Sequence, residues 1–332
     1  MADTKIEWAT KVWNPVRGCS LVSEGCRNCY AMRQAHRFSG PGRPYEGLTE
    51  IGPNGPRWNG KVRLVQELLD VPLRWRKPQR VFVNSMSDLF HPAVPVRFIA
   101  EVFNTMAAWR LDCQKRDCDH EEENCYKDSG HIYQILTKRA AWMLELLKPG
   151  GLLEQDMAEY WPGDSPLAMA YENRPAFPNV WLGVSVEDQK TADERIPLLL
   201  QTPAAVRFVS EEPSLGQILR APFLKDGLIH QWIWGGESGS RARPPHPDWA
   251  RAARDECVAA NVEFFFKQWG EWGPHTEHLG GGLFVRPNGS LGTQGDYWDG
   301  KAAAMDRVGK KASGRLLDGR EWNEYPTPQS IS

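Results

Sequence analysis

The sequence predicts an α/β protein that folds as a partial or full βα barrel with long loop insertions. Three observations point to this class: short apolar runs alternate with helix-like stretches, the runs are nearly continuous, and each ends in polar residues. Near-continuous apolar strands suit a parallel sheet that helices cover. Polar clusters after nearly every strand favour a ring of strands, because an open sheet binds its ligand mainly at one crevice.

Apolar runs along the chain are expected to form the strands of this sheet. They occupy residues 80–91, 131–139, 179–188, 205–213, 229–239 and 262–270. The carboxyl ends of parallel strands meet at one edge, where βα barrels carry their active sites. We therefore expect the polar residues that follow these runs to lie near one another.

Three stretches between the runs predict helices. Residues 95–109 repeat apolar side chains at three- and four-residue spacing, which places them on one helical face. Residues 140–151 end in a proline and two glycines, which stop helices. Residues 247–261 begin with Pro247 and Asp248, and the Asp248 carboxylate is expected to cap the helix.

Long connections interrupt the alternation at residues 39–60, 111–130 and 152–178. Loops of this length in a compact domain are typical of lids and binding loops. We expect residues 1–275 to form the barrel core with these insertions. Residues 276–332, which are rich in glycine and polar residues, are expected to pack on the core as a C-terminal extension.

Bulk properties exclude some classes of protein. No apolar run approaches the roughly 20 residues that cross a bilayer, and the N-terminus lacks an apolar signal-peptide stretch. A soluble cytoplasmic protein without structural disulfides is therefore expected. The formal net charge is -2, so any contact with nucleic acid must come from a local patch such as residues 74–80.

Cys19, Cys26 and Cys29 form a cluster that predicts a metal site, because closely set thiols in a reducing compartment are typical metal ligands. Structural zinc needs a fourth ligand, for instance His36. A 4Fe-4S cluster held by three thiolates leaves one iron open. S-adenosylmethionine can chelate that iron, so that an electron from the cluster can cleave its sulfonium group. The residues alone leave both metals open.

Several stretches together carry a family resemblance that runs from about residue 5 to about residue 326. They are "RGCSLVSEGCRNCYA", "VFVNSMSDLFH", "YQILTKR", "VWLGVSVED", "VRFVSEEP", "WGGESG", "FFFKQWGEW" and "GREWNEYP". As a set they resemble the phage-associated three-cysteine-motif family of radical S-adenosylmethionine-like proteins. The resemblance implies a barrel of the radical-SAM type, a 4Fe-4S cluster at Cys19, Cys26 and Cys29, and S-adenosylmethionine (SAM) as cosubstrate. It names no substrate.

Strand-end residues are the candidates for contact with the cosubstrate. Glu237 can accept a hydrogen bond from an ammonium group, and Lys138 can hold a carboxylate or phosphate. Glu211 can serve as an acid or base or bind a ribose hydroxyl, and Ser87 and Asp88 follow the first strand after the cysteines. Each has a plain alternative, a solvated polar residue at a strand end.

A second cysteine group lies in the acidic insertion. Cys113, Cys118 and Cys125 are joined there by His120. Three thiols and an imidazole can form a closed zinc site or hold an auxiliary cluster. Their spacings match no standard zinc finger, so a lid without metal is the alternative.

The leading hypothesis is a radical SAM enzyme that abstracts hydrogen from an unidentified substrate, with modification or repair of a nucleic acid or nucleotide as the first candidate. Its expected partners are SAM and a reductant such as flavodoxin or ferredoxin, and the need for a companion protein stays open. No membrane partner is expected. The alternative is a non-catalytic binding protein, stabilised by zinc or an iron–sulfur cluster, for a nucleic-acid or protein partner.

Overall fold

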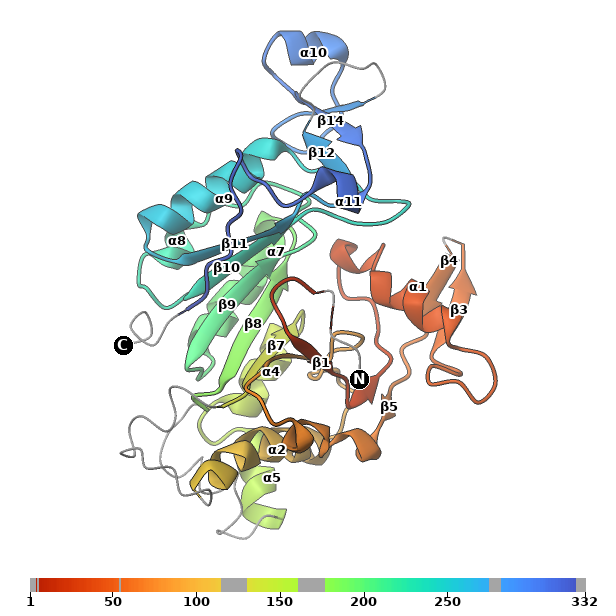
Figure 1. Ribbon diagram of the computed structural model, residues 1–332, viewed down its shortest axis with the longest axis vertical. Coiled ribbons are helices and arrows are strands. Elements are labelled where there is room, and N and C mark those ends of the chain that lie inside the picture. Colours follow the sequence, from red (N-terminus) through yellow and green to blue (C-terminus); the bar gives the residue numbers. More distant parts are fainter. Residues whose placement is uncertain are drawn as a thin grey trace.

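The computed structural model describes residues 4, 6–53, 55–114, 130–160, 177–274 and 282–326. Its centre is a seven-stranded sheet that curls into a half-barrel (Figure 1). Each neighbouring pair of strands is parallel, and the strands follow one another in chain order. They are β1 (Lys11–Trp13), β6 (Arg80–Val83), β7 (Ile132–Thr137), β8 (Val180–Val186), β9 (Val206–Glu211), β10 (Gln231–Gly235) and β11 (Glu263–Gln268). The predicted α/β class and parallel sheet are confirmed, and β1 is a strand that the apolar runs did not indicate.

Helices cover the outer face of this sheet (Figure 1). They are α2 (Val96–Gln114), α4 (Ala140–Leu147), α5 (Leu152–Tyr160), α7 (Gln189–Gln201), α8 (Ala221–Leu224) and α9 (Pro247–Ala259). Strand β8 shows how the two faces are divided: Val180, Leu182 and Val184 belong to the large core beneath the helices, whereas Trp181 belongs to a separate inner cluster. Alternate side chains of a strand point to opposite faces, so one apolar run supplies both cores.

The start of α9 corrects one prediction. Asp248 does not cap this helix. The N-cap is His246, whose Nδ1 accepts a hydrogen bond from the Asp248 backbone N–H at 3.2 Å, and Pro247 occupies the first helical turn. An imidazole nitrogen can accept from the helix amide as a carboxylate does, and the sequence pattern of proline and aspartate did not distinguish the two residues.

The concave face of the half-barrel is packed by aromatic side chains. Trp8, from the segment before β1, lies with its ring centroid 4.4 Å from Phe82 and 6.2 Å from Phe208. Tyr325, near the end of the described chain, packs on Phe265 and lies under the guanidinium group of Arg80, 4.0 Å from its ring centroid. Segments from both ends of the chain therefore fill the inside of the curved sheet.

A small lobe projects beside β1 (Figure 1). It contains α1 (Tyr30–Arg37) and two short antiparallel pairs, β3 (Thr49–Gly52) with β4 (Gly55–Trp58) and β2 (Val16–Arg17) with β5 (Arg63–Leu64). Short 3-10 helices lie at Glu24–Cys26, Gln66–Leu68 and Val71–Arg74. The predicted insertion at residues 39–60 is thus partly a hairpin. Most of the insertions at 111–130 and 152–178 lies outside the described residues.

The C-terminal part forms a second sheet. Its strands are β12 (Trp272–Pro274), β14 (Ala303–Arg307) and β13 (Leu283–Val285), with α10 (Gln294–Trp298) and α11 (Lys310–Ser313) beside them. The chain then returns to the half-barrel and runs along β11. Phe266 N–H donates to the Trp322 carbonyl at 2.9 Å, and Glu324 N–H donates to the Phe264 carbonyl at 3.2 Å. This segment covers a sheet edge that would otherwise present unpaired backbone groups.

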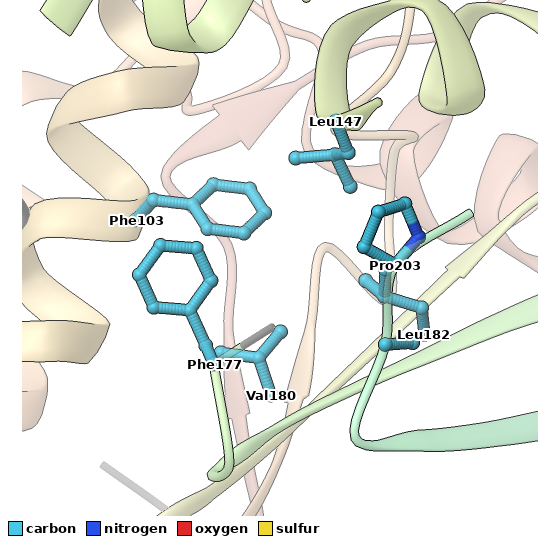
Figure 2. Close-up of a pocket in the computed structure, with 7 residues that line it drawn as sticks. Phe103, Leu147, Phe177, Val180, Leu182 and Pro203 are labelled. Carbon is cyan, nitrogen blue, oxygen red and sulfur yellow. The ribbon is translucent and has the colours of Figure 1, made fainter. Parts of the chain in front are cut away.

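An apolar cavity of about 10 Å³ lies between α2, α4 and the start of β8 (Figure 2). Phe103, Phe177 and Leu147 are among its lining residues. A space of this size and lining suits side-chain packing and not a ligand. Among the described residues, no helix combines the length and apolar character that a membrane span requires.

Candidate functional site

The three cysteines lie in the segment that follows β1 and crosses the carboxyl ends of the strands, residues 18–29, which we call the cysteine loop. Gly18 forms a parallel bridge to Ser87 after β6, and Cys29 is the N-cap residue of α1. Cys29 N–H donates to the Cys26 carbonyl at 3.2 Å, so these two cysteines share one turn. All three are free and partly buried.

Two of the three thiols, those of Cys19 and Cys29, have raised pKa values. Burial raises the pKa of Cys19 to about 12 and also raises the pKa of Cys29, and the neighbouring cysteines raise both further. Backbone N–H groups of Ala31 and Met32, at the start of α1, act on Cys29 in the opposite direction. As the side chains lie, no group of three or more His, Cys, Asp or Glu residues among those described is arranged to hold a metal ion.

Asp88 and Arg139 anchor the first part of the cysteine loop. Arg139, after β7, donates from Nη1 to Asp88 Oδ2 at 2.6 Å and from Nη2 to Ser20 Oγ at 2.8 Å. Its Nη1 also lies 3.9 Å from Cys19 Sγ. Thr137 Oγ1 donates to Asp88 Oδ1 at 2.8 Å. Two strand ends are therefore joined beneath Cys19 by one buried ion pair.

Ser87 bridges Gly18 at the start of the loop and also holds β2, the strand just before the loop. Its hydroxyl donates to the Val16 carbonyl at 2.7 Å. Asn84, just after β6, has a φ of 59° and accepts from Val16 N–H through its side-chain oxygen at 3.2 Å. Asparagine tolerates this left-handed conformation better than most residues, which lets the chain turn sharply after the strand.

Glu187 anchors the middle of the loop from the end of β8. It accepts from Ser23 Oγ at 2.9 Å, pairs with Lys138 Nζ, and pairs with Arg195 Nη1 at 3.1 Å. Burial alone would raise the pKa of Glu187, but Lys138 and Arg195 hold it below its usual range. A Cβ atom on Gly25 would lie 2.3 Å from Glu187 Oε1, so only glycine fits at this position of the loop.

Glu237 acts on the loop from the end of β10 through Arg243. Arg243 donates from Nη2 to Glu237 Oε1 at 2.7 Å and to the Glu24 carbonyl at 3.0 Å. Asn28 Nδ2 donates to the Arg241 carbonyl at 2.9 Å. The predicted residues Ser87, Asp88, Lys138 and Glu237 thus all lie around one loop.

Glu211 lies apart from this group. Its carboxylate faces the helix layer, where it pairs with Arg220 at 2.5 Å, with both side chains fully buried, and accepts from Trp232 Nε1 at 2.9 Å. The next residue, Glu212, pairs instead with Lys267 of β11 at 2.8 Å. Neighbouring residues of a strand point to opposite faces, so Glu212 faces the inner side of the sheet and the predicted site residue Glu211 does not.

Sequence reasoning missed Glu187 and Lys267 as site residues, and it chose Glu211 where its neighbour Glu212 faces inward. The signal for Glu187 was present: it is the first charged residue after a wholly buried apolar strand, as Lys138 is after β7. Ser185 connects these charges, because its hydroxyl accepts from Lys138 Nζ at 2.5 Å and donates to the Glu212 carbonyl at 3.2 Å. Ends of four strands therefore contribute two Lys–Glu pairs to the rim.

Some buried polar side chains of the sheet have atoms without hydrogen-bond partners within the described chain. Gln134 is fully buried, and neither its amide nitrogen nor its amide oxygen is hydrogen-bonded within the described chain. The Ser210 hydroxyl and the Asn84 side-chain nitrogen are also buried and have no hydrogen-bond partner within the described chain. By strand alternation Gln134 and Ser210 face the concave side, since Leu136 and Phe208 beside them pack in the inner cluster. An unsatisfied buried polar group is costly, so the contacts within the described chain do not account for these atoms.

The second cysteine group lies outside the part of the chain that the structure describes. Cys113 belongs to α2, but its side chain is beyond the described part, and so are Cys118, His120 and Cys125.

Comparison with models of protein families assigns the chain to a family. The family model DUF5131, "Protein of unknown function", matches residues 3–113 and 122–326. The chain belongs to the DUF5131 family. The DUF5131 match includes the whole cysteine loop and the residues at the ends of β6, β7, β8 and β10 that hold it. Cys118 and His120 fall between the two matched segments. Neither the curated proteins nor the solved structures yield a match to the chain.

Proposed function

We propose that this DUF5131 protein is a radical S-adenosylmethionine enzyme in which Cys19, Cys26 and Cys29 hold a 4Fe-4S cluster. One observation carries the proposal: a loop with three thiols is tied to the carboxyl ends of four strands of a parallel half-barrel. That edge is where βα barrels place their catalytic residues.

The donor set fits such a cluster. Thiolates are the usual ligands of iron–sulfur clusters, and three of them leave one iron without a protein ligand. Cys19 and Cys29 pack against the same apolar cluster, and Cys26 is in one turn with Cys29. The side chains around them are already joined in ion pairs, and Glu187 and Asp88 have cationic partners of their own.

The chemistry supplied by the two groups, when bound, is reductive cleavage. With both bound, one electron from a reductant such as flavodoxin or ferredoxin would allow SAM to supply a hydrogen-abstracting group, with methionine and 5′-deoxyadenosine as the products. The residues of this chain hold and shield the reactants. The Lys138–Glu187 and Lys267–Glu212 pairs and the unpartnered atoms of Gln134 and Ser210 offer the polar contacts for SAM and substrate.

Anaerobic purification tests the cluster. The expected protein is brown and holds about four irons per chain. A Cys26→Ala variant is expected to lose most of this iron. The matched control is Cys257→Ala, which removes a buried thiol on α9, outside the loop, and is expected to keep it.

Catalysis needs a second measurement. The reduced, iron-loaded protein is incubated with SAM, and 5′-deoxyadenosine and methionine are quantified by mass spectrometry. Both products are expected in equal amounts. A colourless protein with one tightly bound zinc would overturn the proposal in favour of a metal-stabilised binding protein. An intact reduced cluster that leaves SAM uncleaved would show that the cysteines have only an electron-transfer or structural role.

A further inference from the structure

The small lobe beside the cysteine loop is strongly basic. We define the basic lobe as residues 27–64, which hold α1, β3, β4 and β5. It carries seven Lys and Arg residues and two Glu residues, whereas the whole chain has a formal net charge of -2. The remainder of the protein is therefore acidic. A local excess of positive charge of this kind attracts polyanions even where the total charge does not.

Several cations of this lobe are not used by the fold. Arg37, Arg43 and Lys61 are exposed, and within the described residues they have no carboxylate partner. Arg57 is different, since it pairs with Glu50 at 2.6 Å. A cation with no role in folding is free to contact a phosphate group.

A like-charge pair at the base of the lobe also points to an anion. Arg17 of β2 lies directly opposite Arg63 of β5 in their antiparallel register. Like charges directly opposite across two strands destabilise the pair. Arg63 is partly compensated by the carbonyl oxygens of Pro44 and Glu46, and the Arg17 guanidinium lies 5.8 Å from the Tyr45 ring centroid. Neither arginine has a carboxylate partner in the described chain, so a bound phosphate would relieve their repulsion.

Helix α1 adds aromatic side chains to these charges. Its buried face holds Ala31, Met32 and Ala35. The opposite face carries Tyr30, Gln34 and Arg37, followed by Phe38 at the helix end. Tyr30 is 48% exposed and Phe38 is 45% exposed, although both are aromatic. A row that combines exposed aromatic rings with cations is typical of surfaces that bind single-stranded nucleic acid, where bases stack and phosphates pair.

We infer that the basic lobe binds a single-stranded nucleic acid, with bases on Tyr30 and Phe38 and phosphates at Arg37, Arg43 and Lys61. This inference rests on the proposed function and names its substrate class. Tyr30 directly follows Cys29, so a strand bound along α1 runs toward the cysteine loop. A single strand is favoured over a duplex because a base inside a stacked helix cannot reach an enclosed site.

Fluorescence anisotropy with labelled single-stranded DNA and RNA tests the inference. The variant R37E/R43E reverses two lobe cations. Its matched control is K190E/K225E, which makes the same charge change at exposed positions on α7 and at the end of α8. R37E/R43E is expected to weaken binding at least tenfold relative to this control. The slope of log K against log salt should fall by about 0.7 for each phosphate that the lobe no longer neutralises. Phe38→Ala is expected to weaken binding by about tenfold without changing that slope.

The same preparations separate this inference from the proposed function. Equal affinity of R37E/R43E and K190E/K225E would overturn the assignment of the lobe, and so would tighter binding to duplex DNA or binding only to anionic vesicles. Iron content and SAM cleavage are measured in parallel. If the protein holds iron and cleaves SAM but does not bind nucleic acid, only the inference about the basic lobe is rejected. If a protein without iron binds nucleic acid through the lobe, the inference is supported and the proposed enzyme activity is rejected.

Discussion

At the scale of single residues, Glu187 has the most demanding environment in the candidate site. Its side chain is 1% exposed and is shared by Lys138, Arg195 and Ser23. A buried carboxylate between two cations contributes little net stability as a pair, but removing it leaves the cations without compensation. Its chief role is therefore to fix where the cysteine loop lies.

Replacing Glu187 tests this role. Glu187→Gln keeps the shape and removes the charge, which is expected to lower the free energy of unfolding by about 3 kcal/mol. Urea denaturation measures the change. Glu194→Gln, at an exposed position of α7, is the control and is expected to stay within about 0.5 kcal/mol of the unmodified protein. Equal effects of the two substitutions would contradict the anchoring role.

The His246 cap predicts a pH dependence of stability. Burial lowers the pKa of His246 below its usual 6.5, and of its charged neighbours Asp248 raises it and Arg251 lowers it. At a pH between the folded-state and the unfolded-state pKa of His246, the unfolded chain binds a proton that the folded chain does not. The free energy of unfolding therefore falls as pH drops through 6.5 and is fully retained above it.

Urea denaturation at several pH values between about 5.5 and about 7.5 checks this contribution. His246→Asn preserves a side-chain acceptor at the N-cap but cannot be protonated. It is expected to be as stable as the unmodified protein at the upper end of the range and to lose less stability at the lower end. His131 and His230 have pKa values lowered by burial as well, so part of the dependence should persist. An unchanged slope in His246→Asn would refute the assignment.

At the scale of elements, the cysteine loop is an irregular segment made rigid by its surroundings. Its backbone and side chains are bound from the ends of β6, β7, β8 and β10. Loops that carry chemistry need this kind of support, because regular backbone hydrogen bonds do not hold them.

Gly25 is the position where this support is tightest. Gly25→Ala would bring a Cβ atom against Glu187 and displace the turn that contains Cys26. We expect a lower iron content after anaerobic reconstitution and a melting temperature lower by about 2 °C or more. Gly40→Ala is the control, since the nearest atom to its Cβ would be 3.9 Å away. Identical iron content and melting temperature in the two variants would show that the loop tolerates displacement.

At the scale of the whole molecule, the half-barrel depends on segments from both ends of the chain. Trp8 and Tyr325 pack inside the curved sheet, and residues near 322–324 cover the edge of β11. An exposed edge strand is a template for pairing with another chain. The C-terminal segment thus protects the sheet from association.

Truncation tests this protection. A chain that ends after residue 319 lacks the covering segment and is expected to associate, which light scattering detects as an increased mean mass. A chain that ends after residue 326 retains the covering segment and Tyr325 and serves as the control. The same mass distribution for both chains would argue against a protective role.

Local sequence patterns were enough to predict the α/β class, the apolar strands and the grouping of polar residues at their carboxyl ends. These features follow from local rules: apolar periodicity, the residues that stop helices, and the common edge of parallel strands. The three cysteines were recognisable as a candidate metal site because their spacing is local too.

Which residues contact one another could be learned from the folded chain alone. Glu211 and Glu212 are adjacent and alike in sequence, yet one pairs with Arg220 under the helices and the other with Lys267 on the inner side. Lys138, Glu187 and Ser23 are distant along the chain and meet only when β7 and β8 end beneath the loop. Burial and the choice of ion-pair partner depend on which distant segments come into contact, and a local pattern carries no information about that choice.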